Sequence, residues 1–232
     1  MTFQSIIVPK ISTVPVHEPR ARAILRWLVR EKVIEEQLST CGRTGNRMAY
    51  AIAEGARKVV ERPDRLPYGQ PVNGLEVIYK RCIYTPTDGF LEEAGCAECR
   101  KEVGVELFAS LEEWMPGISD NFTCPRCGHE DDINGFLFLQ ACAFSNLGFI
   151  FNNWGEAGFK QSFIDAFADW LDQPVAVVQE AGSPHWWTRP TPLPPSIHRY
   201  TRLEDVDLAR YRAVLWITHR PVDDTLLAEL GK

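Results

Sequence analysis

Apolar and polar positions in the first part of the chain follow the periods of short strands and amphipathic helices. Residues 3–11 (FQSIIVPKI) predict a strand that ends near Pro9, and residues 19–37 predict a helix. The apolar stripe of this helix consists of Ile24, Trp27, Leu28 and Ile34. A second, shorter helix is predicted over about 45–60, and residues 75–85 (LEVIYKRCIYT) predict a strand because β-branched and aromatic residues dominate them.

The pattern after residue 133 is richer in aromatic residues. Residues 135–144 (GFLFLQACAF) and 147–154 (LGFIFNNW) predict two strands, and the Ser-Asn pair between them predicts that they form a hairpin. Residues 159–171 predict an amphipathic helix because phenylalanines recur at helical spacing, and residues 174–180 predict a closing strand. Together with the first part of the chain, this order predicts an α+β fold with a mixed sheet and helices on one face.

Composition divides the chain into segments. Residues 181–200 include five prolines between positions 184 and 195, which predicts an extended linker. Residues 201–232 predict a small α-β-α appendage, since Thr201 and Glu204 match a helix capping pair and a strand-like apolar run follows. We therefore expect one α+β domain built from 1–91 and 133–180, with an insert at 92–132, followed by the linker and the appendage.

Two Cys-x-x-Cys knuckles lie in the insert. Thiolates suit Zn²⁺, which prefers a tetrahedral shell, and two intervening residues let one tight turn present both sulfurs of a knuckle. The 24 residues between the knuckles are slightly more than a zinc ribbon usually has, and a longer hairpin accommodates them. The alternative is a pair of free or redox-active knuckles. The predicted ligands of a structural zinc ion are Cys96, Cys99, Cys124 and Cys127.

The rest of the composition indicates a globular protein of the cytoplasm. The 232 residues are 45% hydrophobic, start with no signal-peptide pattern and contain no apolar run long enough for a membrane span. Thiols stay reduced in the cytoplasm, so clustered cysteines there indicate metal binding before disulfides. We expect Cys41, Cys82 and Cys142 to be buried small apolar residues. His129 follows Cys127 directly and is expected to be exposed rather than a fifth ligand.

The charge of the insert narrows the choice of partner. The whole chain has a net charge of -6, and residues 92–132 contain eleven Asp or Glu against three Lys or Arg. Such a segment repels phosphate, which argues against binding of nucleic acid through the insert. We expect a partner protein with a basic surface instead.

Other residues are weaker candidates for contact with a ligand or partner. An arginine row on the first helix predicts either a solvated face or a nucleic-acid contact. Asn153, Asp165 and His185 are the best candidates for an enzyme acting on a small polar substrate in a cleft between sheet and ribbon, and Trp186 next to His185 predicts either an anchor for the tail or a ligand clamp. The possible contact residues are Arg22, Arg26, Arg30, Asn153, His185 and Trp186.

Sequence motifs of common enzymes are missing from the chain. It contains no P-loop and no G-x-S-x-G nucleophile elbow. The "GRTG" stretch at 42–45, with Arg43 and Arg47, predicts a plain turn or a phosphate-binding one. A shell of four thiolates also leaves a zinc ion no open position for substrate. These observations favour a zinc-stabilised binding or regulatory module over an enzyme.

Residues 81–100, 110–154 and 163–175 resemble an uncharacterised protein family found mainly in pseudomonads. Members are sometimes labelled sugar ABC-transporter ATPases, and the likeness covers about 1–180. The resemblance implies no established activity. The sequence contradicts the transporter label, because it lacks the P-loop that ATP hydrolysis needs. The tail from residue 181 departs from the family pattern.

Overall fold

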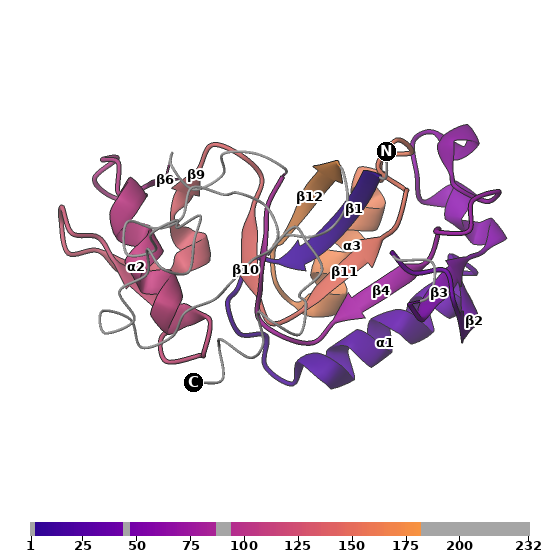
Figure 1. Ribbon diagram of the computed structural model, residues 1–232, viewed down its shortest axis with the longest axis horizontal. Coiled ribbons are helices and arrows are strands. Elements are labelled where there is room, and N and C mark those ends of the chain that lie inside the picture. The colour runs from indigo at the N-terminus through magenta and orange to yellow at the C-terminus, as the bar shows by residue number, and fades with distance from the viewer. Residues whose placement is uncertain (1–2, 44–46, 87–93, 182–232) are drawn as a thin grey trace, which may run out of the picture. The chain divides into compact units, whose positions relative to one another are not determined.

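The computed structural model describes residues 3–43, 47–86 and 94–181 (Figure 1). The chain divides into two units, Met1–Pro184 and His185–Lys232, and every described residue belongs to the first. The predicted linker after residue 181, the predicted α-β-α appendage, His185 and Trp186 therefore lie outside the described residues. Within the described ranges, no helix has the length and apolar character needed to cross a membrane.

A six-stranded sheet forms the centre of the described fold. Its strands are β1 (Phe3–Pro9), β2 (Ile34–Ser39), β3 (Ala49–Ile52), β4 (Leu75–Ile78), β11 (Gly148–Phe151) and β12 (Val175–Ala181). Their order is β12-β1-β11-β4-β3-β2, and every neighbouring pair is antiparallel. The α+β class is confirmed, but the expected mixed sheet was wrong, because no two neighbouring strands of this sheet run parallel.

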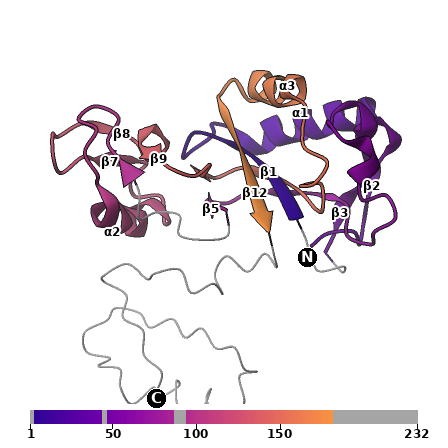
Figure 2. The ribbon, with the colours of Figure 1, turned by 90° about the horizontal axis from the view of Figure 1, so that it is seen from above.

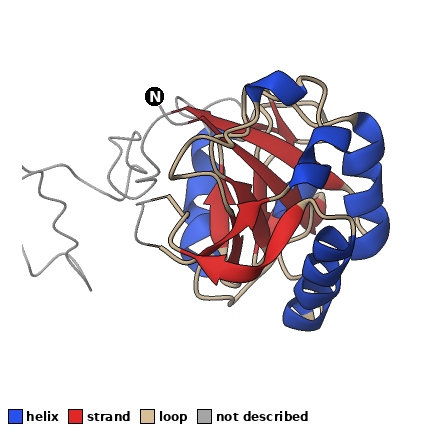
Figure 3. Cartoon of the chain, turned by 90° about the vertical axis from the view of Figure 1, so that its right-hand side faces the viewer, coloured by secondary structure: helices blue, strands red, loops and turns tan. Residues whose placement is uncertain are grey.

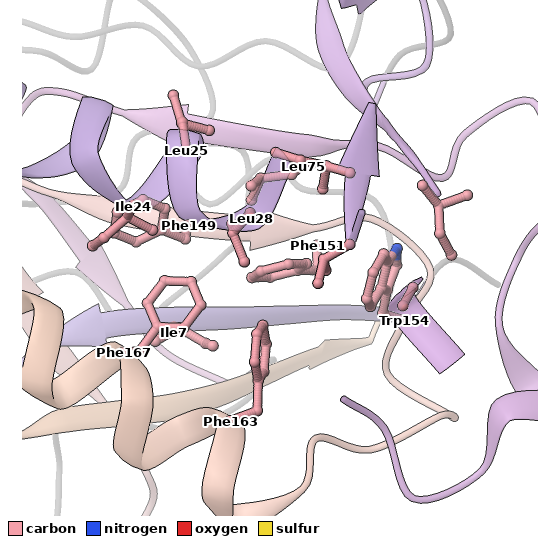
Figure 4. Close-up of a cluster of buried hydrophobic side chains, with 14 of the residues drawn as sticks. Ile7, Ile24, Leu25, Leu28, Leu75, Phe149, Phe151, Trp154, Phe163 and Phe167 are labelled. Atoms are coloured by element: carbon pink, nitrogen blue, oxygen red, sulfur yellow. The ribbon is translucent and has the colours of Figure 1, made fainter. Parts of the chain in front are cut away.

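Two helices, α1 (His17–Arg30) and α3 (Gln161–Leu171), pack on the same face of this sheet (Figures 2 and 3). Side chains alternate along a strand, so Ile7 and its partner Phe149 face the helices. Figure 4 shows these residues with Leu28 of α1 and Phe167 of α3 in one apolar cluster. The rings of Phe149 and Phe167 meet edge to face, with centroids 5.1 Å apart. This cluster holds the two helices to the sheet.

The predicted helices of the first part were wrong in extent or type. The first helix ends at Arg30 rather than continuing to residue 37, because Lys32 has a left-handed backbone (φ 55°) and the chain then enters β2. The predicted helix over 45–60 is instead β3 followed by a 3₁₀ helix, Glu54–Lys58. Gly55 packs there so closely that a Cβ atom would lie 2.2 Å from the carbonyl oxygen of Glu31.

Strand pairing also differs from the prediction. The segment 75–85 forms two strands, β4 and β5 (Cys82–Tyr84), which belong to different sheets. The predicted hairpin of 135–144 and 147–154 was wrong, since β10 (Ala143–Ser145) pairs with β5 whereas β11 pairs with β1 and β4. A second 3₁₀ helix, Pro63–Arg65, lies between β3 and β4.

The remaining elements form a second, smaller group. They are β6 (Ala94–Gly95), α2 (Gly104–Trp114), β7 (Asn121–Thr123), β8 (Glu130–Asp132), a 3₁₀ helix (Ile133–Gly135) and β9 (Leu137–Phe138). Strand β6 pairs with β9, and β7 pairs with β8. We call residues 94–138 the cysteine module, because they contain all four knuckle cysteines.

Candidate metal centre

The cysteine module has its own apolar cluster, separate from the one under α1 and α3. Leu107 and Trp114 of α2 contribute to it, and Phe122 of β7 meets Phe136 edge to face with ring centroids 4.8 Å apart. Two of the knuckle cysteines, Cys96 and Cys124, are buried in the same cluster. Packing of the module therefore brings together the two knuckles, one of which precedes α2 in the chain while the other follows it. The predicted longer hairpin between the knuckles was wrong, since a helix fills much of this gap.

The first knuckle follows β6 in a tight turn. The backbone N–H of Cys96 donates to the carbonyl oxygen of Lys101 (2.9 Å), and the N–H of Arg100 donates to that of Cys96 (3.1 Å). Arg100 takes a left-handed conformation (φ 58°), which closes the turn. Gly95 and Glu102 form an antiparallel bridge directly outside it.

The second knuckle lies between β7 and β8 and has the same form. The N–H of Cys124 donates to the carbonyl oxygen of His129 (2.7 Å), and the N–H of Gly128 donates to that of Cys124 (2.9 Å). Gly128 has φ 78°, a conformation that glycine adopts without strain. The N–H of Arg126 points at the Sγ of Cys124 from 3.4 Å, a contact that stabilises a thiolate.

The four sulfur atoms form a compact cluster. All lie within 4.8 Å of one another, with 3.7 Å between Cys96 and Cys127 and 3.8 Å between Cys99 and Cys124. A zinc ion with tetrahedral Zn–S bonds of about 2.3 Å places its sulfurs about 3.8 Å apart. The cluster could therefore hold a metal ion such as zinc without large rearrangement. Cys96 and Cys124 form its buried side, whereas Cys127 is exposed.

The thiols influence one another's ionisation. Burial raises the pKa of Cys124, but hydrogen bonds from the backbone N–H groups of Arg126 and Cys127 and from neighbouring thiols bring it down to about 7. For Cys127 the backbone N–H of His129 lowers the pKa, yet burial and the three neighbouring thiols outweigh it and raise the pKa to about 12. One thiol thus ionises easily, and the negative charge opposes ionisation of a neighbouring thiol. A bound cation would lower the pKa of the remaining thiols.

His129 is not one of the four ligands in this cluster. Its ring lies near that of Phe136, with centroids 6.1 Å apart, and its Nε2 is 4.0 Å from a carboxylate oxygen of Asp131. The contribution of His129 to the knuckle is its backbone carbonyl.

The predicted arginine row lies on the exposed side of α1. Arg22, Arg26 and Arg30 are all exposed. Arg22 pairs with Glu18 (3.5 Å) and Arg30 with Glu31 (3.3 Å), so two of the three arginines have acidic neighbours. The row is far from any other predicted site residue in sequence, and its contact with nucleic acid stays a prediction.

Both polar atoms of the Asn153 side-chain amide form hydrogen bonds with the backbone. Its Oδ1 accepts the N–H of Phe3 (3.2 Å), its Nδ2 donates to the carbonyl oxygen of Val72 (2.8 Å), and its own φ is 63°. Asp165 accepts a hydrogen bond from Gln161 one helical turn earlier. The structure does not bring these two residues together by any contact, and the predicted enzymatic role stays a prediction.

A polar junction joins the cysteine module to the six-stranded sheet, and sequence reasoning missed it. Arg81, between β4 and β5, donates to the carbonyl oxygen of Trp114 (2.8 Å), to Thr13 (2.7 Å) and to Asp120 (2.5 Å). The indole N–H of Trp114 donates to the hydroxyl of Ser12 (2.7 Å). Arg81 is one of three charged residues in the predicted strand 75–85, and nothing in the local sequence distinguishes it, because its partners are far away in sequence.

Comparison of the chain with protein-family models, with curated proteins and with solved structures gave no match. The four-cysteine cluster is consistent with a zinc-ribbon-like insert.

Proposed function

We propose that Cys96, Cys99, Cys124 and Cys127 bind one structural Zn²⁺ ion, and that the protein is a non-enzymatic binding or regulatory protein. The observation that carries the zinc proposal is the pair of sulfur–sulfur distances, 3.7 and 3.8 Å, which match the edge of a tetrahedral ZnS₄ shell. Each knuckle is closed by its own backbone hydrogen bonds, which hold its two cysteines in one tight turn.

The proposed ion is structural because four thiolates fill the coordination shell of zinc. No position then remains for a water molecule or a substrate. The apolar cluster of the module is small, and domains of this size commonly need a metal or disulfides in addition to their core. We also propose that the protein acts in the cytoplasm, a reducing compartment that keeps thiols available for a metal ion. We propose as well that residues of about 1–180 belong to the uncharacterised family that they resemble.

We propose further that the module offers an acidic surface to a protein with a basic surface. Its exposed acidic residues include Glu98, Glu102, Glu106, Glu113 and Glu130. Of these, Glu106 is neutralised by Arg126 at 2.8 Å. Four zinc-bound thiolates add two further negative charges to the same region. This charge supports a basic protein partner and argues against nucleic acid.

Metal analysis of the purified full-length chain tests the zinc proposal. We expect one zinc per chain in the natural sequence and loss of that zinc in Cys124→Ser. The control is Cys142→Ala, which removes a buried thiol that lies outside the cluster and should keep one zinc. Retention of one tightly bound zinc by Cys124→Ser, or no divalent metal in the natural protein purified without chelator, would overturn the proposal.

Charge reversal tests the acidic surface. The probe is polylysine, titrated at several salt concentrations. The variant Glu102→Lys/Glu113→Lys should bind it more weakly than the control Glu35→Lys/Glu36→Lys, which makes the same change in net charge on exposed residues of β2. Equal losses in both variants would show that only net charge matters and would overturn a surface specific to the module.

A further inference from the structure

We propose that one face of the cysteine module is a docking surface for a protein segment that presents an apolar side chain next to a lysine or arginine. The face consists of Leu137, Gly95 and Glu102, and we call it the ribbon face. It rests on the acidic surface proposed above, since it locates where on the module the basic partner binds and what that partner carries besides positive charge.

Three short stretches of chain lie side by side in the ribbon. Leu137 of β9 is opposite Gly95 of β6, and Gly95 in turn is opposite Glu102 in an antiparallel bridge. Side chains of residues that are opposite one another in such a ladder project to the same side. Leu137, Gly95 and Glu102 therefore form one row across one face.

The other face of the ribbon belongs to the core of the module. Ala94 is opposite Phe138, and the N–H of Val103 donates to the carbonyl oxygen of Ala94 (2.9 Å). Ala94 and Val103 are part of the apolar cluster of the module, and Phe138 packs against it. Because side chains alternate along a strand, the ribbon face points away from this cluster. In agreement, Leu137 and Glu102 are both exposed.

Gly95 leaves the middle of the ribbon face open, although the fold does not require a glycine there. A Cβ atom at this position would lie 3.8 Å from the carbonyl oxygen of Lys101 and 3.9 Å from the Cβ of Leu137, which are ordinary contact distances. Its backbone is not left-handed, unlike that of Gly128. Glycine weakens a strand and commonly marks a place where another molecule approaches the backbone. A partner lying across the face accounts for the glycine, whereas packing and backbone conformation do not.

Leucines border the open position on one side. Leu137 is 42% exposed, and Leu139, directly after the module, is 77% exposed. Single exposed leucines are common on soluble proteins. Two of them in one short segment beside an open backbone position offer apolar area that a partner's apolar side chain can cover with a gain in free energy.

Negative charge borders the open position on the other side. Glu102 has no ion pair among the described residues, whereas Glu106 holds the guanidinium of Arg126 at 2.8 Å. Lys101 precedes Glu102 in the ribbon and, by alternation, does not share its face. The module as a whole contains nine Asp or Glu against three Lys or Arg. Charge complementarity therefore selects a lysine or arginine beside the apolar side chain of the partner.

Fluorescence anisotropy of a labelled peptide of alternating lysine and leucine, titrated with the zinc-loaded full-length chain, tests the proposal. A second peptide with serine in place of leucine reports the contribution of charge alone. The leucine peptide should bind the natural chain about tenfold more tightly, the scale of one leucine side chain that becomes largely buried. Gly95→Val fills the open position with a residue that suits a strand and should abolish this difference between the peptides. Leu137→Gln should reduce it to about twofold, because part of the apolar border is lost.

Matched controls make the same changes outside the module. A Cβ atom at Gly69 meets nothing within 4 Å, and Leu38 on β2 is 49% exposed, so Gly69→Val and Leu38→Gln should bind both peptides as the natural chain does. The metal content of each variant is measured as well, because Gly95 directly precedes a knuckle cysteine. Should Gly95→Val lose its metal, the comparison of Leu137→Gln with Leu38→Gln decides the question.

The outcome separates the ribbon face from the acidic surface on which it rests. If the natural chain binds the two peptides equally, or if the module variants and their controls behave alike, the ribbon face is wrong. The acidic surface survives that result as long as the serine peptide binds Glu102→Lys/Glu113→Lys more weakly than Glu35→Lys/Glu36→Lys. Loss of this last difference overturns the acidic surface itself.

Discussion

The junction between the cysteine module and the sheet can be tested through one hydrogen bond. Trp114 is 1% exposed, and its indole N–H donates to the hydroxyl of Ser12, which is fully buried. Trp114→Phe removes this donor and retains an aromatic ring that can still meet Phe144 edge to face, as the indole does at 5.7 Å. Ser12→Ala removes the acceptor from the other side.

The expected effects follow from the contacts of the two residues. Trp114→Phe should lower the free energy of unfolding by about 3 kcal/mol: about 1–2 from the lost hydrogen bond, about 1 from the smaller ring, and about 0.5 from the weaker contact with the guanidinium of Arg81. Ser12→Ala alone leaves the indole N–H buried and unpaired, which costs about 2 kcal/mol. Both single variants lose the same hydrogen bond, so the double variant should lose about 1 kcal/mol less free energy of unfolding than the sum of the two single losses.

The assay is urea unfolding of the zinc-loaded chain followed by far-ultraviolet circular dichroism. The four proteins of the cycle should share one slope with denaturant, so that shifts of the midpoint report stability. If the two single changes add within about 0.3 kcal/mol, Trp114 and Ser12 are not coupled and the reasoning about this junction fails.

Two further predictions concern single residues of the fold. Burial raises the pKa of the Cys142 thiol from 9.0 to about 12, so the folded chain keeps a proton that the unfolded chain loses. This contribution to stability is complete below about pH 9 and disappears as the pH rises toward about 12. Urea midpoints measured from pH 8 upward should therefore fall more steeply for the natural chain than for Cys142→Ala. Parallel curves for the two proteins would contradict the prediction. Val16 is 68% exposed and has a left-handed backbone with φ 46°, which a β-branched residue rarely adopts. Val16→Asn should raise the free energy of unfolding by about 1 kcal/mol, measured as a higher melting temperature, and a lower one would refute the assigned strain.

Local chemistry in the sequence was enough to predict part of this protein. The spacing of the four cysteines needs only one tight turn per knuckle, and the structure brings all four sulfurs together. The helix at 161–171 follows from apolar residues at helical spacing, because Phe163, Phe167 and Leu171 are all buried in the cluster on the sheet. In both cases the pattern is local in the sequence, and its own residues make the contacts that it predicts.

Elements that depend on distant partners were not predictable in this way. Residues 34–39 (IEEQLS) contain good helix formers, yet they form β2 at the edge of the sheet, where only Ile34 is buried. Pairing with β3 outweighs the helix propensity of these residues, and the local sequence does not encode this contact. The same holds for β10, which lies two residues before β11 but pairs with β5 across the whole cysteine module. Arg81 looked like an ordinary polar interruption of a strand, since its partners come from distant segments.

The pairing of β5 with β10 also explains why a metal ion bound by the four cysteines would act together with the junction. Tyr84 lies opposite Ala143, so the chain leaves the sheet domain and returns to it at adjacent positions, and everything between depends on its own contacts. The second knuckle sits on the hairpin β7–β8. The hairpin begins directly after Asp120, which accepts a hydrogen bond from Arg81, and it ends at Asp132, which accepts the backbone N–H of Ser12.

A metal ion bound by the knuckle at the tip of this hairpin would therefore fix the two carboxylates at its base. Without the ion, the thiols at the tip repel one another once ionised, and the short three-residue strands have little else to hold them in register. The polar junction lies at the base of the same hairpin, so its strength should follow the occupancy of the metal centre. Coupling between Trp114 and Ser12 is then a property of the zinc-loaded protein and should weaken when a chelator removes the metal.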